Sequence, residues 1–312
     1  MYAAAVLAVL IIAGLAVVGF ELWKQGNQPG PSVNSAAVPV PAQPPAPSFE
    51  RPAWIMSDVP STAYCHDMIN RLMCVGVSAY RPTRNEAVAE ANDAALEELV
   101  SAVGLKISDP FFRDTVIAGY SSVRAQLLST LQAAEVDPPT AAAATAAAAA
   151  VSKARTRVVE VLRASGGAAV PSQRSDWYWE EYAAPKGGSA GGSETLVFVR
   201  YDVTLDAVRA LVEKYSATTP VLGGVAMTAF PALAWQYPDF TGGAMLTKVG
   251  RPLGDAGIAP RSVVTAVGDA RITDAASLAR RVEDSQATDR ITLTVKTGDA
   301  PARTVEVRRP PR

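Results

Sequence analysis

Very few side chains in this sequence could carry out acid–base or nucleophilic chemistry. The 312 residues include a single histidine, His66, which stands beside Asp67 without a serine or cysteine in a supporting motif. Ser189 lies in the pattern G-x-S-x-G at 187–191, which in some hydrolases places a nucleophile on a turn between a buried strand and a helix. Here the pattern stands in a run of small residues with a strand expected after it, which indicates a flexible hairpin loop. We therefore expect no catalytic residue.

The two cysteines, Cys65 and Cys74, are nine residues apart and lack the C-x-x-C spacing of redox motifs. One histidine and two cysteines are too few for a structural zinc site, which takes four nitrogen or sulfur ligands. In an oxidising compartment the pair could form a structural disulfide, which we favour over two buried free thiols or a pair held too far apart to join. We expect no metal, no cofactor and no small-molecule substrate.

The charge balance argues against a nucleic-acid-binding protein. The chain has 29 Lys and Arg residues against 30 Asp and Glu residues, a formal net charge of −1. Non-specific nucleic-acid binding needs a basic surface that displaces counterions from phosphates. Apolar residues make up 49% of the chain but aromatic residues only 7%, so we expect modest cores rich in small side chains.

The first 24 residues are predicted to form a transmembrane anchor. Tyr2 to Phe20 contains nineteen residues without a charge, and as a helix it would span about 28 Å, one hydrocarbon core. The bulky residues at its end favour an uncleaved anchor over a cleaved signal peptide. Residues 25–53 hold eight prolines and are predicted to be a disordered linker that reaches up to about 85 Å. We expect a single-pass protein of the bacterial inner membrane with most of the chain in the periplasm, although the charge bias around the anchor is slight.

Residues 54–216 are predicted to form an α+β domain. A strand at 73–80 leads into a helix that opens with the capping-box spacing Thr83 to Glu86. Helices follow at about 110–134 and 140–165, then strands at 176–182 and 194–202, and a helix at 203–215. Alternation puts Trp177 and Trp179 on one strand face, where core packing is expected and a ligand-stacking face is the alternative.

The order of these segments resembles the LPP-twenty-like domain of bacterial envelope lipoproteins and flagellar accessory proteins. The resemblance is carried by Trp54, CVGVSAY (74–80), the helix from Asn85, DWYWEEY (176–182) and TLVFVRYDV (195–203). It implies an envelope location and a role in assembly or scaffolding, and it implies no chemistry. This chain differs from the family in having a predicted membrane anchor where the family has a lipidated cysteine, and in its long alanine-rich helix.

The most specific pattern lies in residues 217–312. The segments that carry it are LGGV (222–225), GAMLTKV (243–249), PLGDAGI (252–258), SVVTAVGD (262–269), a helix at 272–283 and a hairpin from 291–296 and 304–307. In order and spacing they resemble a PDZ domain of the bacterial HtrA-protease type, although Arg261-Ser262 replaces the usual Gly-Asp in a turn away from the groove. The protease barrel of those enzymes is not present upstream, so we do not expect a protease.

The PDZ resemblance implies a groove that receives a peptide C-terminus. Glycines 223 and 224 would let backbone N–H groups receive a carboxylate, and the strand from Val225 would offer a free edge for an extended peptide. By the same resemblance, Ala279 and Val282 would face Val225 and Met227 across the groove and select an apolar terminal residue. The predicted peptide-binding residues are Leu222, Gly223, Gly224, Val225, Met227, Ala279 and Val282.

The sequence therefore predicts a multidomain chain with an N-terminal transmembrane helix, an α+β middle domain and a C-terminal PDZ module built as a small β-barrel or sandwich with helices. We expect a non-catalytic periplasmic adaptor that binds C-termini or exposed strands of envelope proteins. Two alternatives are a secretion-machine component similar to the type II secretion C protein and a regulator that delivers substrates to an envelope protease. A PDZ fold used only for docking is also compatible with the sequence.

Overall fold

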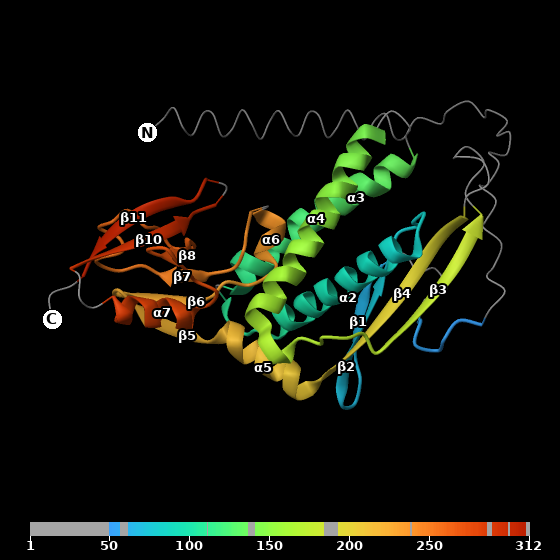
Figure 1. The fold of residues 1–312 in the computed structure, drawn as a ribbon, viewed down its shortest axis with the longest axis horizontal. Helices are drawn as coiled ribbons and strands as arrows, with labels where there is room; N and C mark the ends of the chain where they lie inside the picture. Colours follow the sequence, from blue (N-terminus) through green and yellow to red (C-terminus); the bar gives the residue numbers. More distant parts are fainter. Residues whose placement is uncertain are drawn as a thin grey trace, which may run out of the picture. The chain divides into compact units, whose positions relative to one another are not determined.

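The computed structural model describes residues 50–56, 62–110, 112–136, 141–183, 193–237, 239–285, 289–298 and 300–309. These residues form an α+β structure with two antiparallel sheets (Figure 1). The predicted fold class is corrected in one respect: its N-terminal transmembrane helix is not supported, since none of the described helices is long and apolar enough to cross a membrane. The span expected at Tyr2–Phe20, most of the linker 25–53 and the loop with Ser189 lie outside the described residues.

The first sheet has the strand order β1-β2-β4-β3. Its strands are β1 (Tyr64–Asp67), β2 (Arg71–Val77), β3 (Asp176–Ala183) and β4 (Ser193–Thr204). Cys65 and Cys74 are register partners on β1 and β2, with their Cα atoms 4.1 Å apart, and they form a disulfide. The predicted disulfide is thus confirmed, and it attaches the short edge strand β1 to the sheet.

Helix α2 (Arg84–Lys106) lies against one face of this sheet. Thr83 caps its first turn by accepting a hydrogen bond from the Glu86 N–H, as the capping-box spacing predicted. A Cβ on Gly76 of β2 would lie 1.9 Å from the Ala91 carbonyl oxygen, so glycine is what allows the helix to approach the strand this closely. A second glycine, Gly104 of α2, is also closely packed. It lies inside the last turn, where the side chains of Ile117 and Phe230 pack against its Cα.

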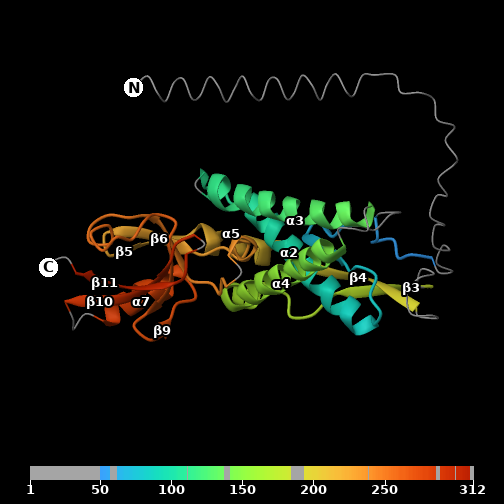
Figure 2. The same cartoon turned by 90° about the horizontal axis from the view of Figure 1, so that it is seen from above.

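Two long helices cover α2 (Figures 1 and 2). They are α3 (Ala118–Val136), which follows a π-helical segment η1 (Phe112–Ile117), and α4 (Ala141–Gly166), which packs against both α2 and α3. The alanine-rich sequence of α4 lets it lie close to its neighbours while keeping high helix propensity. After the short 3-10 segment η3 (Gly167–Ala169) and the β3–β4 hairpin, α5 (Leu205–Ser216) returns to the same layer.

The opposite face of the first sheet is covered by residues 50–56. Arg51 pairs with the fully buried carboxylate of Glu180, with nitrogen–oxygen distances of 2.5 and 2.9 Å. The Trp54 indole N–H donates to Asp176 at 3.1 Å, and Trp54 packs against a small cluster around Phe198. Residues 50–56 are therefore part of the folded domain.

The second sheet has the order β11-β10-β8-β7-β6-β5, with β9 paired to β8. Its strands are β5 (Thr218–Val221), β6 (Gly224–Thr228), β7 (Ala244–Lys248), β8 (Val263–Val267), β9 (Ala270–Arg271), β10 (Arg290–Lys296) and β11 (Arg303–Arg308). Helix α7 (Ala275–Asp284) covers its inner face, and the short helix α6 (Leu233–Gln236) lies between β6 and β7 in the chain.

One hydrophobic core connects the two sheets through the helical layer, and the C-terminal sheet has a second core of its own under α7. The β6–β7 connection carries Phe230, whose ring stacks edge-on against Phe112 and Tyr215 with centroids 4.7 and 5.0 Å away. Trp235 of α6 meets Tyr120 of α3 in the same way, at 6.1 Å. All the described residues belong to one compact unit, 47–312. The C-terminal sheet is consequently fixed to the helical layer by buried aromatic contacts.

Candidate functional site

The groove predicted from the sequence is already occupied by the chain itself. Strand β6 pairs with β7 on one side and with β5 on the other, in the register Thr218–Met227 to Val221–Gly224. The prediction that the strand from Val225 offers a free edge is therefore wrong. Only Ala217 separates α5 from β5 in the chain. The chain therefore passes from the helical layer directly into the position beside β6.

The glycine pair has a different role from the predicted one. Leu222 and Gly223 have φ values of 46° and 72° and form the two-residue turn of the β5–β6 hairpin, a turn that needs positive φ at both positions. A Cβ on Gly223 would lie 1.9 Å from the Arg251 carbonyl oxygen, and one on Gly224 would lie 2.6 Å from that of Lys248. In this structure the glycines serve the turn and the close packing of the loop 248–253.

The predicted apolar residues do not all face one another. Met227 packs in the core shared with the helical layer, whereas Val282 packs in the core of the C-terminal sheet. Because successive side chains of a strand point to opposite faces, Ala226 rather than Met227 shares the core with Val282. Val225 and Ala279 are half-buried. The resemblance thus placed the right elements beside each other with the strand shifted by one residue.

Strand β5 fills the place that the peptide was expected to take. It contacts α7 and pairs with β6 at the same time. Val221 is 7% exposed and packs in the same core as Leu278 and Val282 of α7. Thr218 and Pro220 are exposed. The strand is therefore held by one buried apolar side chain and a short ladder of backbone hydrogen bonds.

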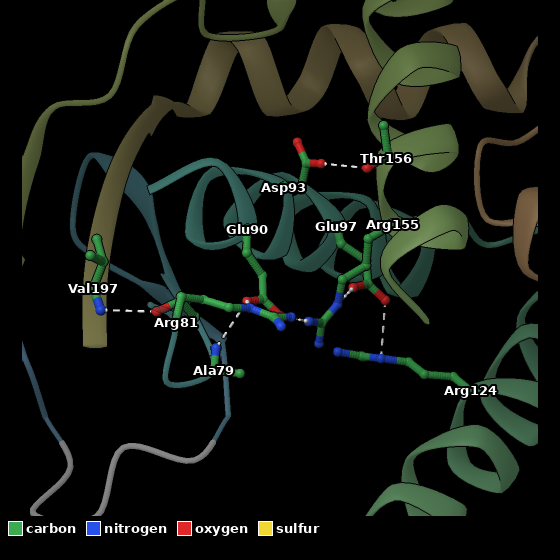
Figure 3. Close-up of polar contacts among 10 residues, drawn as sticks. Ala79, Arg81, Glu90, Asp93, Glu97, Arg124, Arg155, Thr156 and Val197 are labelled. Atoms are coloured by element: carbon green, nitrogen blue, oxygen red, sulfur yellow. Dashed lines mark hydrogen bonds and ion pairs between the residues drawn. The ribbon is translucent and has the colours of Figure 1, made fainter. Parts of the chain in front are cut away.

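A cluster of buried ion pairs, which the sequence analysis did not predict, lies between α2 and α4 (Figure 3). Glu97 of α2 is 1% exposed and receives the Arg155 Nε–H at 2.7 Å and the Tyr120 hydroxyl at 3.1 Å. Arg124 of α3 lies 3.1 Å from the same carboxylate. Removing one partner of a buried ion pair costs about 3–5 kcal/mol. Glu97 therefore fixes α2, α3 and α4 relative to one another.

The chain of ion pairs continues along α2 to the surface. Glu90 accepts from the Arg81 Nε–H at 2.7 Å and from the Ala79 N–H at 3.1 Å, and Arg155 lies 3.8 Å away. Asp93 accepts a hydrogen bond from the Thr156 hydroxyl at 2.8 Å (Figure 3). Burial raises the pKa of Asp93, and the Thr156 hydrogen bond opposes this shift.

Asp93 and Glu90 line a groove of about 590 Å³ between the first half of α2 and the alanine-rich half of α4. The acidic side belongs to α2 and the opposite side to Thr145, Ala148, Ala149, Ser152 and Thr156 of α4. Glu90 pairs with Arg81, and Asp93 is hydrogen-bonded to Thr156, so these groups connect α2 with the neighbouring elements. The spacing of Glu90, Asp93 and Glu97 places them on one face of the helix, and this was the sequence signal for the cluster. Such a row of acidic residues is also typical of an ordinary solvated helix face, so it did not predict burial.

The remaining candidate residues take structural positions. His66 is exposed on β1 opposite Met73. Trp179 packs against the helix-side core with the Arg84 guanidinium 3.7 Å from its ring centroid, as core packing predicted. Trp177 on the same face is 36% exposed. Among the described residues, no group of three or more His, Cys, Asp or Glu side chains is placed to hold a metal ion. No protein-family model and no curated protein matches this chain.

Proposed function

We propose that this chain is a non-catalytic binding protein of an oxidising compartment such as the bacterial periplasm. Its C-terminal sheet would hold an extended segment of a partner protein along β6, in exchange for β5. The observation that carries the proposal is the position of β5 itself, an antiparallel strand seated on β6 and against α7. The Cys65–Cys74 disulfide supports the compartment, since such bonds persist mainly in oxidising environments.

Strand β5 has the properties of a replaceable occupant. It has four residues, and Pro220 has no N–H to contribute to the ladder. Burying one valine side chain is worth about 1.5–3 kcal/mol, so a partner strand of similar length and apolarity could replace its contacts. The apparent affinity for such a strand would be the intrinsic affinity reduced by the small fraction of molecules in which β5 is released.

The position of Val221 supports a preference for apolar C-termini. Val221 is the last residue of β5, its side chain is buried beside Val282, and the chain then turns at Leu222 and Gly223. A peptide that ended in an apolar residue could place that side chain where Val221 lies. Its terminal carboxylate would then occupy the space that the turn fills in this structure. The PDZ resemblance predicted the same preference.

A strand-exchange experiment tests the proposal with a labelled peptide that copies residues 214–221, KYSATTPV, with a free C-terminus. Val221→Asp places a charge in the apolar core and should release β5, so the peptide should bind this variant at least tenfold more tightly than the unaltered chain. Val221→Ser, a milder change, should shift affinity in the same direction. Thr218→Asp alters an exposed residue of the same strand and serves as the matched control.

A locked variant, in which β5 is covalently held on β6, tests the opposite condition. Thr219→Cys combined with Ala226→Cys joins two register partners of β5 and β6, and once this disulfide is verified the peptide should no longer bind. Equal affinity for the released and locked variants would place the peptide elsewhere and refute strand exchange. The partner captured by the released variant would separate a secretion-machine component from a regulator of an envelope protease.

A further inference from the structure

A second groove, of about 390 Å³, lies beside α7 and β9 and shares no residue with the proposed peptide site. It is lined by Arg271, Thr273, Ser277, Arg280, Arg281 and Asp284. Three arginines and one aspartate therefore line one concave surface, and their side chains carry a net charge of about two positive units at neutral pH.

The arginines of this groove are not used in ion pairs within the described part of the chain. Asp284 stands three and four residues from Arg281 and Arg280 on the helix, and among the described residues no ion pair joins it to either of them. By contrast, Arg209 pairs with Asp206 at 2.8 Å on the equally exposed surface of α5. Since unpaired like charges repel one another, their accumulation in one groove is unfavourable unless a counter-charge binds.

One of the three guanidinium groups is held in place by the fold. The Arg271 Nη2 group donates a hydrogen bond to the Thr241 carbonyl oxygen at 2.8 Å, which leaves further N–H groups of the same fork to face the groove. Arg280 and Arg281 are exposed on α7. A ligand would thus meet one fixed donor and two adaptable ones.

The polar groups at the start of α7 line the groove but are already hydrogen-bonded within the helix cap. Asp274 accepts from the Ser277 N–H at 2.7 Å, and the Ser277 hydroxyl accepts from the Asp274 N–H at 3.1 Å, in a capping box. The Ser277 hydroxyl also donates to the Asp274 carbonyl oxygen at 2.7 Å. These groups are satisfied within the helix cap, so recognition in the groove would depend on the guanidinium groups.

We infer that this groove binds a phosphate group. A single carboxylate is satisfied by one guanidinium fork, whereas a phosphate carries up to two charges and accepts hydrogen bonds from several forks at once. Two sources share this chemistry, a soluble phosphate or phosphoester and the headgroup of an anionic phospholipid.

The test uses the full chain and Arg280→Gln combined with Arg281→Gln. The matched control is Arg113→Gln combined with Arg308→Gln, which removes the same charge from exposed arginines outside the groove. In the first arm, inorganic phosphate is titrated at constant ionic strength and the rise in melting temperature is followed. The half-saturating phosphate concentration should increase at least tenfold in the groove variant and stay within twofold in the control.

The second arm measures sedimentation with vesicles of phosphatidylglycerol in phosphatidylcholine and with phosphatidylcholine alone. Other parts of the chain can contact vesicles, so the readout is the difference between the groove and control variants. A difference with inorganic phosphate identifies a soluble ligand, and a difference only with phosphatidylglycerol vesicles identifies the lipid headgroup. If the groove and control variants behave alike in both arms, the inference is overturned. Neither arm depends on strand exchange at β6.

Discussion

Replacing Phe230 by alanine should separate the stability of the two sheets. Phe230 is 1% exposed, and its partners Phe112 and Tyr215 belong to the helical layer, whereas Phe230 itself belongs to the β6–β7 connection. Truncating a buried phenylalanine costs about 3–5 kcal/mol. Domains of this kind are stable by about 5–15 kcal/mol in all, so the loss should be a large fraction of the total.

The loss should appear as reduced cooperativity as well as reduced stability. Urea unfolding is followed by tryptophan fluorescence, to which Trp235 contributes from α6 and Trp177 and Trp179 contribute from β3. The unaltered chain should unfold in one transition, because the core cluster around Phe230 contains side chains of the first sheet, the helical layer and the C-terminal sheet. In Phe230→Ala the C-terminal sheet should lose its attachment to the helical layer and unfold at a lower urea concentration than the first sheet.

A conservative variant controls for the change of residue. Phe230→Leu keeps most of the buried volume and should cost less than about 1.5 kcal/mol, with a single transition retained. If Phe230→Ala lost less than about 1 kcal/mol and still unfolded in a single transition, the aromatic cluster would not couple the sheets and the reasoning would fail.

Two further predictions concern the first sheet and the helical layer. Replacing Cys65 and Cys74 by alanine should lower the free energy of unfolding by about 2–3 kcal/mol, the chain-entropy value for so short a loop. Reducing the disulfide of the unaltered protein should lower its urea midpoint by the same amount. An unchanged midpoint would show that the disulfide does not stabilise the fold. Burial raises the pKa of Asp93 in the folded state, so the folded form holds the carboxyl proton more tightly than the unfolded form. The free energy of unfolding therefore falls as the pH rises from the unfolded-state pKa through the folded-state pKa. Asp93→Asn, which can still accept the Thr156 hydrogen bond, should therefore raise the urea midpoint at pH 7 and leave it unchanged at pH 3; a gain of equal size at both pH values would exclude ionisation as the cause.

The sequence by itself determined the local structure well. Thr83 with Glu86 marked the start of α2, the alanine-rich segment marked α4, and alternation separated the two faces of β3, because each of these signals depends on residues within one or two turns or on a period of two. The cysteine pair was also found from the sequence, and the structure explains it as a register pair of two neighbouring strands.

Only the tertiary structure decided which elements meet. That β5 occupies the edge of β6 depends on how the chain leaves α5. Which face of β6 meets which core decides that Met227 packs with the helical layer while Ala226 packs with Val282. The burial of Glu97 depends on arginines 27 and 58 residues away in the chain. No local pattern encodes such pairings, since a charged side chain has the same neighbours in sequence whether it faces water or a buried partner from another helix.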